Sequence, residues 1–208
     1  MYTLGMDALT YEVPSQEDAH ELLLFYRTLQ NEQPYLHIYP DDALQSVEEL
    51  QNYIHRLNQI GASHIVVAKE CQRIIGCVTV EALTLPDHCG VGELGISVLK
   101  EYRDRGIGTR LMREVLSWAA GNSHIREIIL HVADANRRAI HVYTELGFMI
   151  EDCGAAVYYH NAGSAGGGGG GGSAGAADSV LAQASGATHG TLCMRIDVAG
   201  QESSDLHA

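Results

Sequence analysis

Several classes of protein are excluded by what this chain of 208 residues lacks. It has no run of roughly 18 consecutive apolar residues, the length that a membrane-spanning helix needs. Residues Met1 to Asp7 show no basic region followed by an apolar segment, so we expect no secretory signal and a cytoplasmic protein. Basic side chains are scarce, because 13 Lys and Arg stand against 26 Asp and Glu. The resulting surface repels nucleic acid and anionic membranes, and it attracts cationic small molecules or basic peptides.

Cysteine patterns are also missing. The number of cysteines is odd and no two of them form a C-x-x-C pair; they are Cys71, Cys77, Cys89, Cys153 and Cys193. The sequence therefore predicts neither a disulfide framework nor a zinc site, and we interpret the thiols as reduced core residues. The histidines show no metal-ligand spacing, so no metal is expected.

One segment differs from the rest in composition. Residues 161–190 are nearly all Gly, Ala, Ser, Asn and Thr, and include a run of glycines at 166–172. Such a segment has almost nothing to bury against the entropy of ordering it. The strand-like residues after it are too few to fold alone. We predict a single domain formed by residues 1–160 plus 188–208, with 161–187 as a flexible insertion within it.

Apolar periodicity predicts an α+β fold. Ser15 and Ser46 each precede an acidic residue by three positions, which is the signature of a capped helix start. Strands are predicted at 64–69, 74–83, 92–99, 125–132, 148–159 and 191–198, after a first strand that ends at Pro14. Because a helix crosses between residues 92–99 and 125–132, these two strands should be parallel neighbours. The last two strands should pair with each other.

The segment that carries the chemistry begins with the strand 92–99. It runs into Arg103-Asp-Arg-Gly106-Ile-Gly108, a glycine turn that opens a helix. Backbone N–H groups and the positive end of the helix dipole meet there, an arrangement that suits a pyrophosphate. The turn is not a P-loop, because no G-x-x-x-x-G-K-[ST] is present. It is not a dinucleotide fingerprint either, because Leu111 replaces the third glycine.

Two motifs in this segment resemble those of the GNAT superfamily of N-acetyltransferases. The first is R-x-x-G-x-G, which ends at Gly108. The second is Asn136, followed by Ala-Ile, Tyr143 and the pair Gly-Phe148. The resemblance covers roughly residues 8–160 and the final strand. It implies the acyl-CoA N-acyltransferase fold, an α/β/α sandwich-like α+β fold in which a mixed, mostly antiparallel sheet of about seven strands is flanked by four helices.

The resemblance also implies acetyl-CoA as co-substrate and a site for it. Backbone groups of the strand before the turn would line the pantetheine arm, and the N–H of Val98 would stabilise the oxyanion. The turn would hold the pyrophosphate, and Asn136 would contact the arm. Tyr143 corresponds to the general acid that protonates the leaving thiolate. The implied cofactor-binding residues are Ile96, Ser97, Val98, Arg103, Asp104, Arg105, Gly106, Ile107, Gly108, Thr109 and Asn136.

Two residues are candidates for the general base. An alkylamine has a pKa of about 10.4, so it must lose a proton before it can attack. Glu93 lies on the strand that leads to the turn, where many relatives keep a base. His131 precedes Asn136 by five residues, at a position where acetylators of protein N-termini often carry a glutamate. An imidazole pKa near 6.5 also suits a base.

Two classes of function remain open at this point. The chain is either an enzyme that transfers an acetyl group directly to an amine of a small molecule or peptide, or an acetyl-CoA-binding sensor or scaffold without catalysis. Acidic residues in the stretch 19–57 are a candidate attraction for a cationic acceptor. They are Glu21, Glu32, Asp41, Asp42, Glu48 and Glu49. A homodimer is an expectation from the resemblance alone, since many members of that superfamily dimerise.

Overall fold

The computed structural model describes residues 9–32, 46–83, 89–151 and 191–199. The chain divides into two compact units, Met1–Leu130 with Ile196–Ala208, and His131–Arg195. The predicted insertion at 161–187 and most of the predicted strand 148–159 lie outside the described residues. The division into one domain and an insertion therefore stays a prediction.

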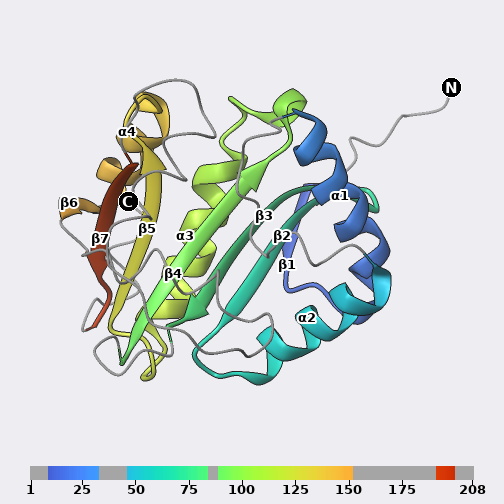
Figure 1. Ribbon diagram of the computed structural model, residues 1–208, viewed down its shortest axis with the longest axis horizontal. Helices are drawn as coiled ribbons and strands as arrows, with labels where there is room; N and C mark the ends of the chain where they lie inside the picture. Colours follow the sequence, from blue (N-terminus) through green and yellow to red (C-terminus); the bar gives the residue numbers. More distant parts are fainter. Residues whose placement is uncertain (1–8, 33–45, 84–88, 152–190, 200–208) are drawn as a thin grey trace, which may run out of the picture. The chain divides into compact units, whose positions relative to one another are not determined.

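The first unit is built on a sheet whose first four strands are antiparallel neighbours in chain order (Figure 1). Its strands are β1 (Leu9–Glu12), β2 (His64–Glu70), β3 (Arg73–Ala82), β4 (Val91–Val98) and the beginning of β5 (Glu127–Ala133). Its helices are η1 (Gln16–Asp18), α1 (Ala19–Glu32), α2 (Val47–Gln59), η3 (Lys100–Tyr102) and α3 (Ile107–Ala120). The strand β5 runs parallel to β4, as the helical crossover between them predicted.

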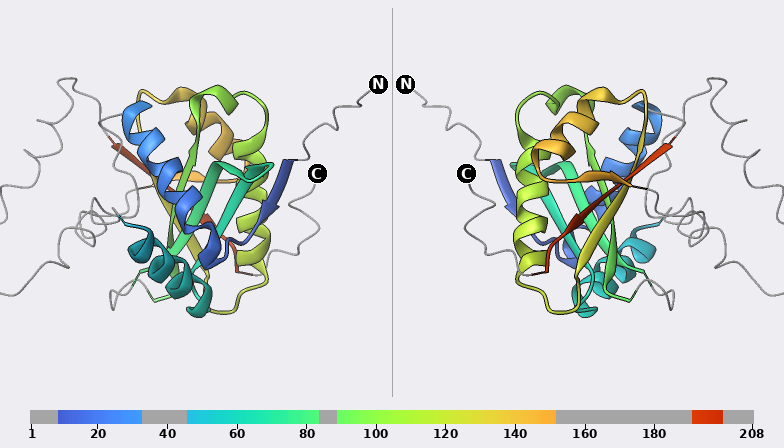
Figure 2. Two further views of the ribbon diagram at one scale, coloured as in Figure 1. Left: turned by 90° about the vertical axis from the view of Figure 1, so that its right-hand side faces the viewer. Right: turned by 90° about the vertical axis from the view of Figure 1, so that its left-hand side faces the viewer.

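Helices cover both faces of these strands. Figure 2 shows α1 and α2 on one face and α3 on the other. The central strands are accordingly buried on both faces, with seven successive buried residues in β3. Such continuous apolar runs are typical of strands between two helical layers. Leu22, Leu50 and Leu111 are among the fully buried side chains that join the three helices to the sheet.

The predicted helix starts are confirmed. The Ser15 and Ser46 side chains accept hydrogen bonds from backbone N–H groups of their helices, and Asp18 and Glu49 return a carboxylate to the backbone of each cap. Each pair forms a capping box, which satisfies N–H groups that a helix start would otherwise leave without partners. The helix that follows the first of these starts, α1, continues to Glu32.

The second unit contains the end of β5, the helix α4 (Arg137–Glu145), the strand β6 (Met149–Glu151) and most of β7 (Thr191–Asp197). The strands β6 and β7 pair antiparallel, as predicted. The Tyr143 and Phe148 rings lie 6.0 Å apart between centroids. Because Phe148 is buried, this contact anchors α4 to the start of β6.

The predicted α+β class, with a mixed and mostly antiparallel arrangement of seven strands and four α-helices, is confirmed in the described residues. The prediction of reduced core cysteines is wrong for Cys193, which is disulfide-bonded, and for Cys71 and Cys89, which are exposed. Cys77 is a buried free thiol, as predicted. A bond between cysteines far apart in sequence depends on the approach of their Cα atoms, which spacing along the chain does not reveal. No helix among the described residues is long and apolar enough to cross a membrane.

Candidate functional site

The strand β4 loses a neighbour half-way along its length. Its described pairs with β5 are Val91↔Glu127, Gly92↔Ile128 and Glu93↔Ile129, and none follows. Its pairing with β3 continues to Val98. Residues 95–98 are half-buried rather than buried. The second half of β4 therefore presents one backbone edge that β5 does not cover, an opening into which an extended ligand can place hydrogen-bonding groups.

The direction of each backbone group on β4 follows from two hydrogen bonds at its ends. The Leu83 N–H donates to the Val91 carbonyl at 2.9 Å, and the Leu99 N–H donates to the Ile75 carbonyl at 3.0 Å. In an antiparallel pair such residues alternate with residues whose N–H and C=O turn the other way. Ser97 thus directs its backbone groups toward β3, whereas Ile96 and Val98 direct theirs into the opening.

The turn after β4 places an uncapped helix start beside the opening. Gly106 is the N-cap of α3, with a φ of 76° and no side-chain hydrogen bond to the first turn. Asp104 also has a positive φ, of 65°. A Cβ at Gly108 would lie 3.8 Å from Val98 Cγ2, so the helix start and the end of β4 are close together. The first-turn N–H groups and the helix dipole make this end of α3 suited to an anion.

The two arginines of the turn differ in what they contact. Arg103 Nε donates to the Val98 carbonyl at 2.9 Å, and its guanidinium lies 3.4 Å from a carboxylate oxygen of Glu32. Arg105 is exposed, with its guanidinium 5.1 Å from the centre of the Tyr102 ring. Arg105 thus leaves its charge at the surface of the turn, whereas Arg103 is tied to β4 and α1.

The candidate base Glu93 lies on the face of the sheet that α1 and α2 cover. It is the register partner of Glu81 on β3. Glu81 accepts a hydrogen bond from the Tyr53 hydroxyl of α2 at 2.8 Å and forms an ion pair with Arg56 at 3.4 Å. Because opposite residues of an antiparallel pair point to the same face, Glu93 and Glu81 place two carboxylates side by side under α2.

Three other polar side chains on this face keep their protons at neutral pH. Burial raises the pKa of Tyr26 and that of Tyr53 well above the ordinary tyrosine value. Burial also raises the pKa of the Cys77 thiol to about 12. None of the three is a base under these conditions.

The second unit carries the remaining candidates. Asn136 is the N-cap of α4, and its Oδ1 accepts a hydrogen bond from the Ala139 N–H at 3.2 Å. Tyr143 is half-buried on α4, and burial raises its pKa to about 12, so its hydroxyl is protonated at neutral pH. His131 is half-buried near the end of β5.

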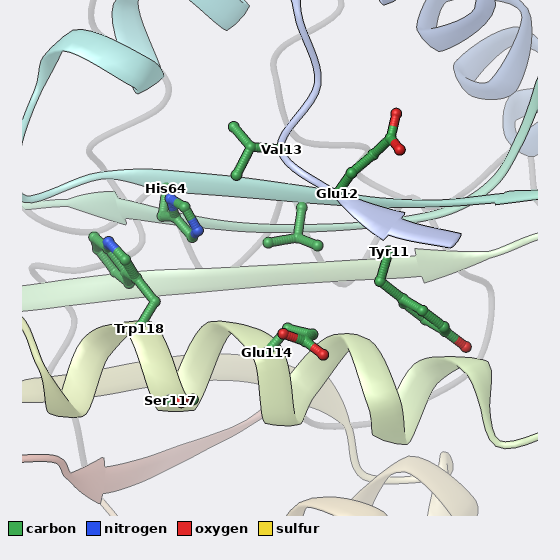
Figure 3. A pocket seen from close by; sticks show the side chains of 8 residues that line it. Tyr11, Glu12, Val13, His64, Glu114, Ser117 and Trp118 are labelled. Carbon is green, nitrogen blue, oxygen red and sulfur yellow. The ribbon is translucent and has the colours of Figure 1, made fainter. Parts of the chain in front are cut away.

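A pocket of about 330 Å³ lies elsewhere, between α3 and the β1–β2 edge. It is lined by Tyr11, Glu12, Val13, His64, Val66, Glu114, Ser117 and Trp118 (Figure 3). Its Glu114 carboxylate is paired with Arg110 at 2.6 Å. Its His64 ring stacks on Trp118, and burial lowers the pKa of that imidazole. No residue predicted from the sequence to act on a substrate lines this pocket.

Comparison with known families identifies the family to which the two motifs belong. The acetyltransferase (GNAT) family matches residues 22–148, which is more than half of the chain and includes both motifs. The chain belongs to the acetyltransferase (GNAT) family. The prediction of a GNAT acetyltransferase is confirmed.

Two curated acetyltransferases illustrate the similarity. L-amino acid N-acetyltransferase AaaT of Escherichia coli (strain K12) is 32% identical over 81 residues, which are 39% of this chain and 50% of AaaT. Spermidine N(1)-acetyltransferase of Vibrio cholerae is 25% identical over 130 residues, 62% of this chain and 74% of that protein. The match thus spans only half the length of AaaT.

Solved structures show the same GNAT fold. An acetyltransferase of the GNAT family from Streptococcus pneumoniae has a TM-score of 0.64 and 26% identity, over 69% of this chain and 86% of its own. The yncA protein of Salmonella typhimurium, a putative acetyltransferase solved with its cofactor acetyl-CoA, has a TM-score of 0.64 at 12% identity, over 93% and 96% of the two chains. The second likeness concerns the fold alone.

Two residues that the sequence did not reveal as neighbours of candidate site residues are Glu81 and Glu32. Glu81 was not singled out, because its neighbour Glu93 becomes apparent only from the β3–β4 register. Glu32 was noted only as one of several acidic residues, although it contacts the turn through both Arg103 and the Lys100 N–H. The described residues contain no group of three or more His, Cys, Asp or Glu arranged to hold a metal.

Proposed function

We propose that this chain transfers the acetyl group of acetyl-CoA to an amine of a small molecule or peptide, by direct attack in a ternary complex. The observation that carries the proposal is the opening along β4 next to the uncapped start of α3. The opening supplies a row of backbone hydrogen-bonding groups, and the start of α3 supplies N–H groups and the positive end of a helix dipole. This combination fits a ligand with an extended arm attached to a pyrophosphate, which is the form of coenzyme A.

Acetyl-CoA supplies an acetyl group already activated as a thioester. The turn at 103–109 holds the pyrophosphate, with the charge of Arg105 beside it. Backbone groups of Ile96 and Val98 bind the arm and donate to the developing oxyanion. Ser97 is four residues after Glu93 on β4, so its side chain lies on the same α1–α2 face, because side chains two residues apart along a strand share a face. Asn136 remains a candidate contact for the arm.

Glu93 is the base we favour, with His131 as the alternative. Glu93 lies on the face that α1 and α2 cover, where Tyr26, Tyr53 and Cys77 all keep their protons. It takes a proton from the acceptor ammonium directly or through a water molecule. The neighbouring Glu81 carboxylate favours a cationic acceptor over a neutral one.

Tyr143 assists the leaving group. Its pKa of about 12 lies above the roughly 8.5 of an ordinary thiol, so Tyr143 is the weaker acid of the two. The Tyr143 hydroxyl therefore stabilises the departing thiolate by donating a hydrogen bond to it, rather than by transferring its proton completely. A charge-assisted hydrogen bond of this kind contributes about 1.5–3 kcal/mol.

The acceptor is an amine whose cationic character we infer from charge. The chain has a formal net charge of −13, and Glu81 and Glu93 lie together under α2. The named substrates of two relatives, an L-amino acid and spermidine, are both amines. Amino acids, polyamines and basic peptides form the first panel to test.

The test combines binding with turnover. We expect calorimetry to show acetyl-CoA binding, and a thiol assay to show release that depends on an amine from the panel. Tyr143→Phe should lower kcat about 10- to 100-fold and leave acetyl-CoA affinity nearly unchanged, as expected for one charge-assisted hydrogen bond to the thiolate. Tyr11→Phe, which removes a hydroxyl on the opposite face of the sheet, is the matched control and should have no effect.

Two further variants identify the base. Glu93→Gln should remove most of the turnover at neutral pH, whereas His131→Gln should retain it. The reverse result would assign the base to His131. Binding without turnover across the whole panel would instead favour a sensor or scaffold, and no binding would refute the proposed use of the 103–109 turn.

A further inference from the structure

Arg103 is the first residue of the R-x-x-G-x-G motif, and its side chain is directed toward the protein. Its Nε–H donates to the Val98 carbonyl at 2.9 Å. The same guanidinium lies 3.4 Å from Glu32 Oε2. The Arg103 side chain is 31% exposed and that of Glu32 only 19%, so this ion pair is partly shielded from water.

The negative charge of Glu32 lies at a position where it destabilises its own helix. Glu32 is the last residue of α1, and that last turn contains no basic side chain. A carboxylate at the negative end of a helix dipole is unfavourable by some tenths of a kcal/mol or more. Its contacts are instead with η3 and the turn after it: both of its oxygens accept from the Lys100 N–H, at 3.1 and 2.9 Å, and its carboxylate pairs with Arg103. The position of Glu32 thus serves the turn rather than α1.

The Val98 carbonyl, which accepts the hydrogen bond from Arg103, belongs to the part of β4 that faces the opening. Val98 directs its N–H and its C=O away from β3, as the alternation along the strand requires. The Val98 carbonyl shares its peptide plane with the Leu99 N–H, which donates to the Ile75 carbonyl at 3.0 Å, so β3 holds this peptide on one side and Arg103 holds it on the other. Without the bond from Arg103, the carbonyl would have no strand neighbour on the side of the opening.

We propose that Arg103, held by Glu32, is a positioning residue for the backbone of β4 rather than a ligand of the pyrophosphate. The inference rests on the proposed function in one respect only, namely that the opening along β4 receives the arm of coenzyme A. It assigns different roles to the two arginines of the motif. Arg105 contributes charge to the phosphates, and Arg103 fixes the peptide between Val98 and Leu99, which ends the opening along β4.

Two probes separate positioning from phosphate binding. Coenzyme A contains the diphosphate and the arm, whereas ADP contains a diphosphate without the arm. Arg103→Lys keeps the positive charge but has no Nε–H for the Val98 carbonyl. We expect it to weaken coenzyme A binding about tenfold, the effect of one hydrogen bond to a charged group, and to change ADP binding less than twofold.

Glu32→Gln keeps an oxygen for the Lys100 N–H and removes the charge that holds Arg103. It should weaken coenzyme A binding in the same selective way, by a smaller factor. The double variant should be no worse than Arg103→Lys alone, because both substitutions break one chain of contacts. Glu101→Gln is the matched control: Glu101 also pairs with an arginine, Arg73, at 2.9 Å. It should bind both probes like the wild type.

A second readout needs no ligand. Amide hydrogen exchange at Leu99, whose N–H donates to the Ile75 carbonyl, should be faster in Arg103→Lys and in Glu32→Gln than in the wild type, and unchanged in Glu101→Gln. Unchanged exchange in the first two variants would overturn the proposal. So would wild-type affinity of Arg103→Lys for coenzyme A, or an equal loss for coenzyme A and ADP. If the wild type binds neither probe, the proposed function fails, and exchange alone decides the role of Arg103.

Discussion

A buried lysine illustrates how much of the first unit depends on single residues. The Lys69 side chain is 7% exposed, and its Nζ lies 2.5 Å from Glu12 and 2.6 Å from Asp18. Asp18 also accepts from the Ser15 N–H at 2.8 Å, so one carboxylate joins β2 to the capping box of η1. Removing the Asp18 charge leaves the buried Lys69 ammonium with less compensating negative charge. This destabilises the folded protein far more than the loss of a surface ion pair would.

We therefore expect Asp18→Asn to lower the free energy of unfolding by about 1–3 kcal/mol at pH 7, measured by urea denaturation. Glu17→Gln, an exposed neighbour in the same turn, is the control and should change it by less than about 0.5 kcal/mol. The effect of Asp18→Asn should depend on pH. Burial alone would raise the pKa of Asp18, but the hydrogen bonds from Lys69 and Ser15 outweigh it and lower that pKa.

The sign of this dependence follows from linkage. A carboxyl group with a lowered pKa in the folded state stabilises the protein above its unfolded pKa, which is about 3.9. That stabilisation is lost as the pH falls through the folded-state pKa. The difference between wild type and Asp18→Asn should therefore be full at pH 6–7 and shrink below about pH 4. An equal difference at every pH would mean that the carboxylate charge is not what Lys69 requires.

At the scale of helices and strands, local signals were predictable and non-local ones were not. The capping boxes at Ser15 and Ser46 are complete within four residues, so the sequence shows them directly. The glycine turn before α3 is equally local. The end of the β4–β5 pairing after Glu93 involves strands far apart in sequence. The same holds for the contact of Glu32 with Arg103, and no local pattern announces either.

The start of α3 provides a prediction at this scale. Gly106 has a φ of 76°, and a Cβ there would meet nothing within 4 Å. The penalty of Gly106→Ala is therefore one of backbone conformation alone, about 1 kcal/mol after the lower entropy of the unfolded chain is considered. If α3 relieves this strain by shifting its first turn, the N–H groups there move as well. We expect a lower melting temperature and coenzyme A binding weakened at least tenfold.

The opposite end of the same helix supplies the control. Gly121 is the C-cap of α3, with a φ of −86°, and a Cβ there would lie 3.6 Å from the nearest atom, the Trp118 carbonyl oxygen. Gly121→Ala should leave coenzyme A affinity unchanged and stability equal or slightly higher. Comparable losses of affinity in both variants would show that α3 responds as a whole, and that the turn has no special part in binding.

The whole molecule raises the question of what the glycine-rich segment contributes. Residues 152–190, between β6 and β7, number 39, and removing Ser164–Ala187 would leave 15. If the segment is an insertion without contacts of its own, shortening it reduces only the entropy lost on closing the loop. That reduction is about 0.8 kcal/mol in favour of the folded state. The deletion should therefore raise the free energy of unfolding slightly and leave coenzyme A affinity within twofold.

The measurement needs a reductant, because the disulfide at Cys193 would otherwise restrict the unfolded chain and hide the entropic gain. A variant in which residues 164–187 keep their composition in scrambled order controls for length, and should match the wild type in stability and affinity. Loss of stability in both variants would mean that this segment docks through its particular sequence. Loss of coenzyme A affinity alone in both would place it at the ligand. If deletion raises the free energy of unfolding by about 0.8 kcal/mol and the scrambled variant is unchanged, the segment acts only as a tether between two paired strands.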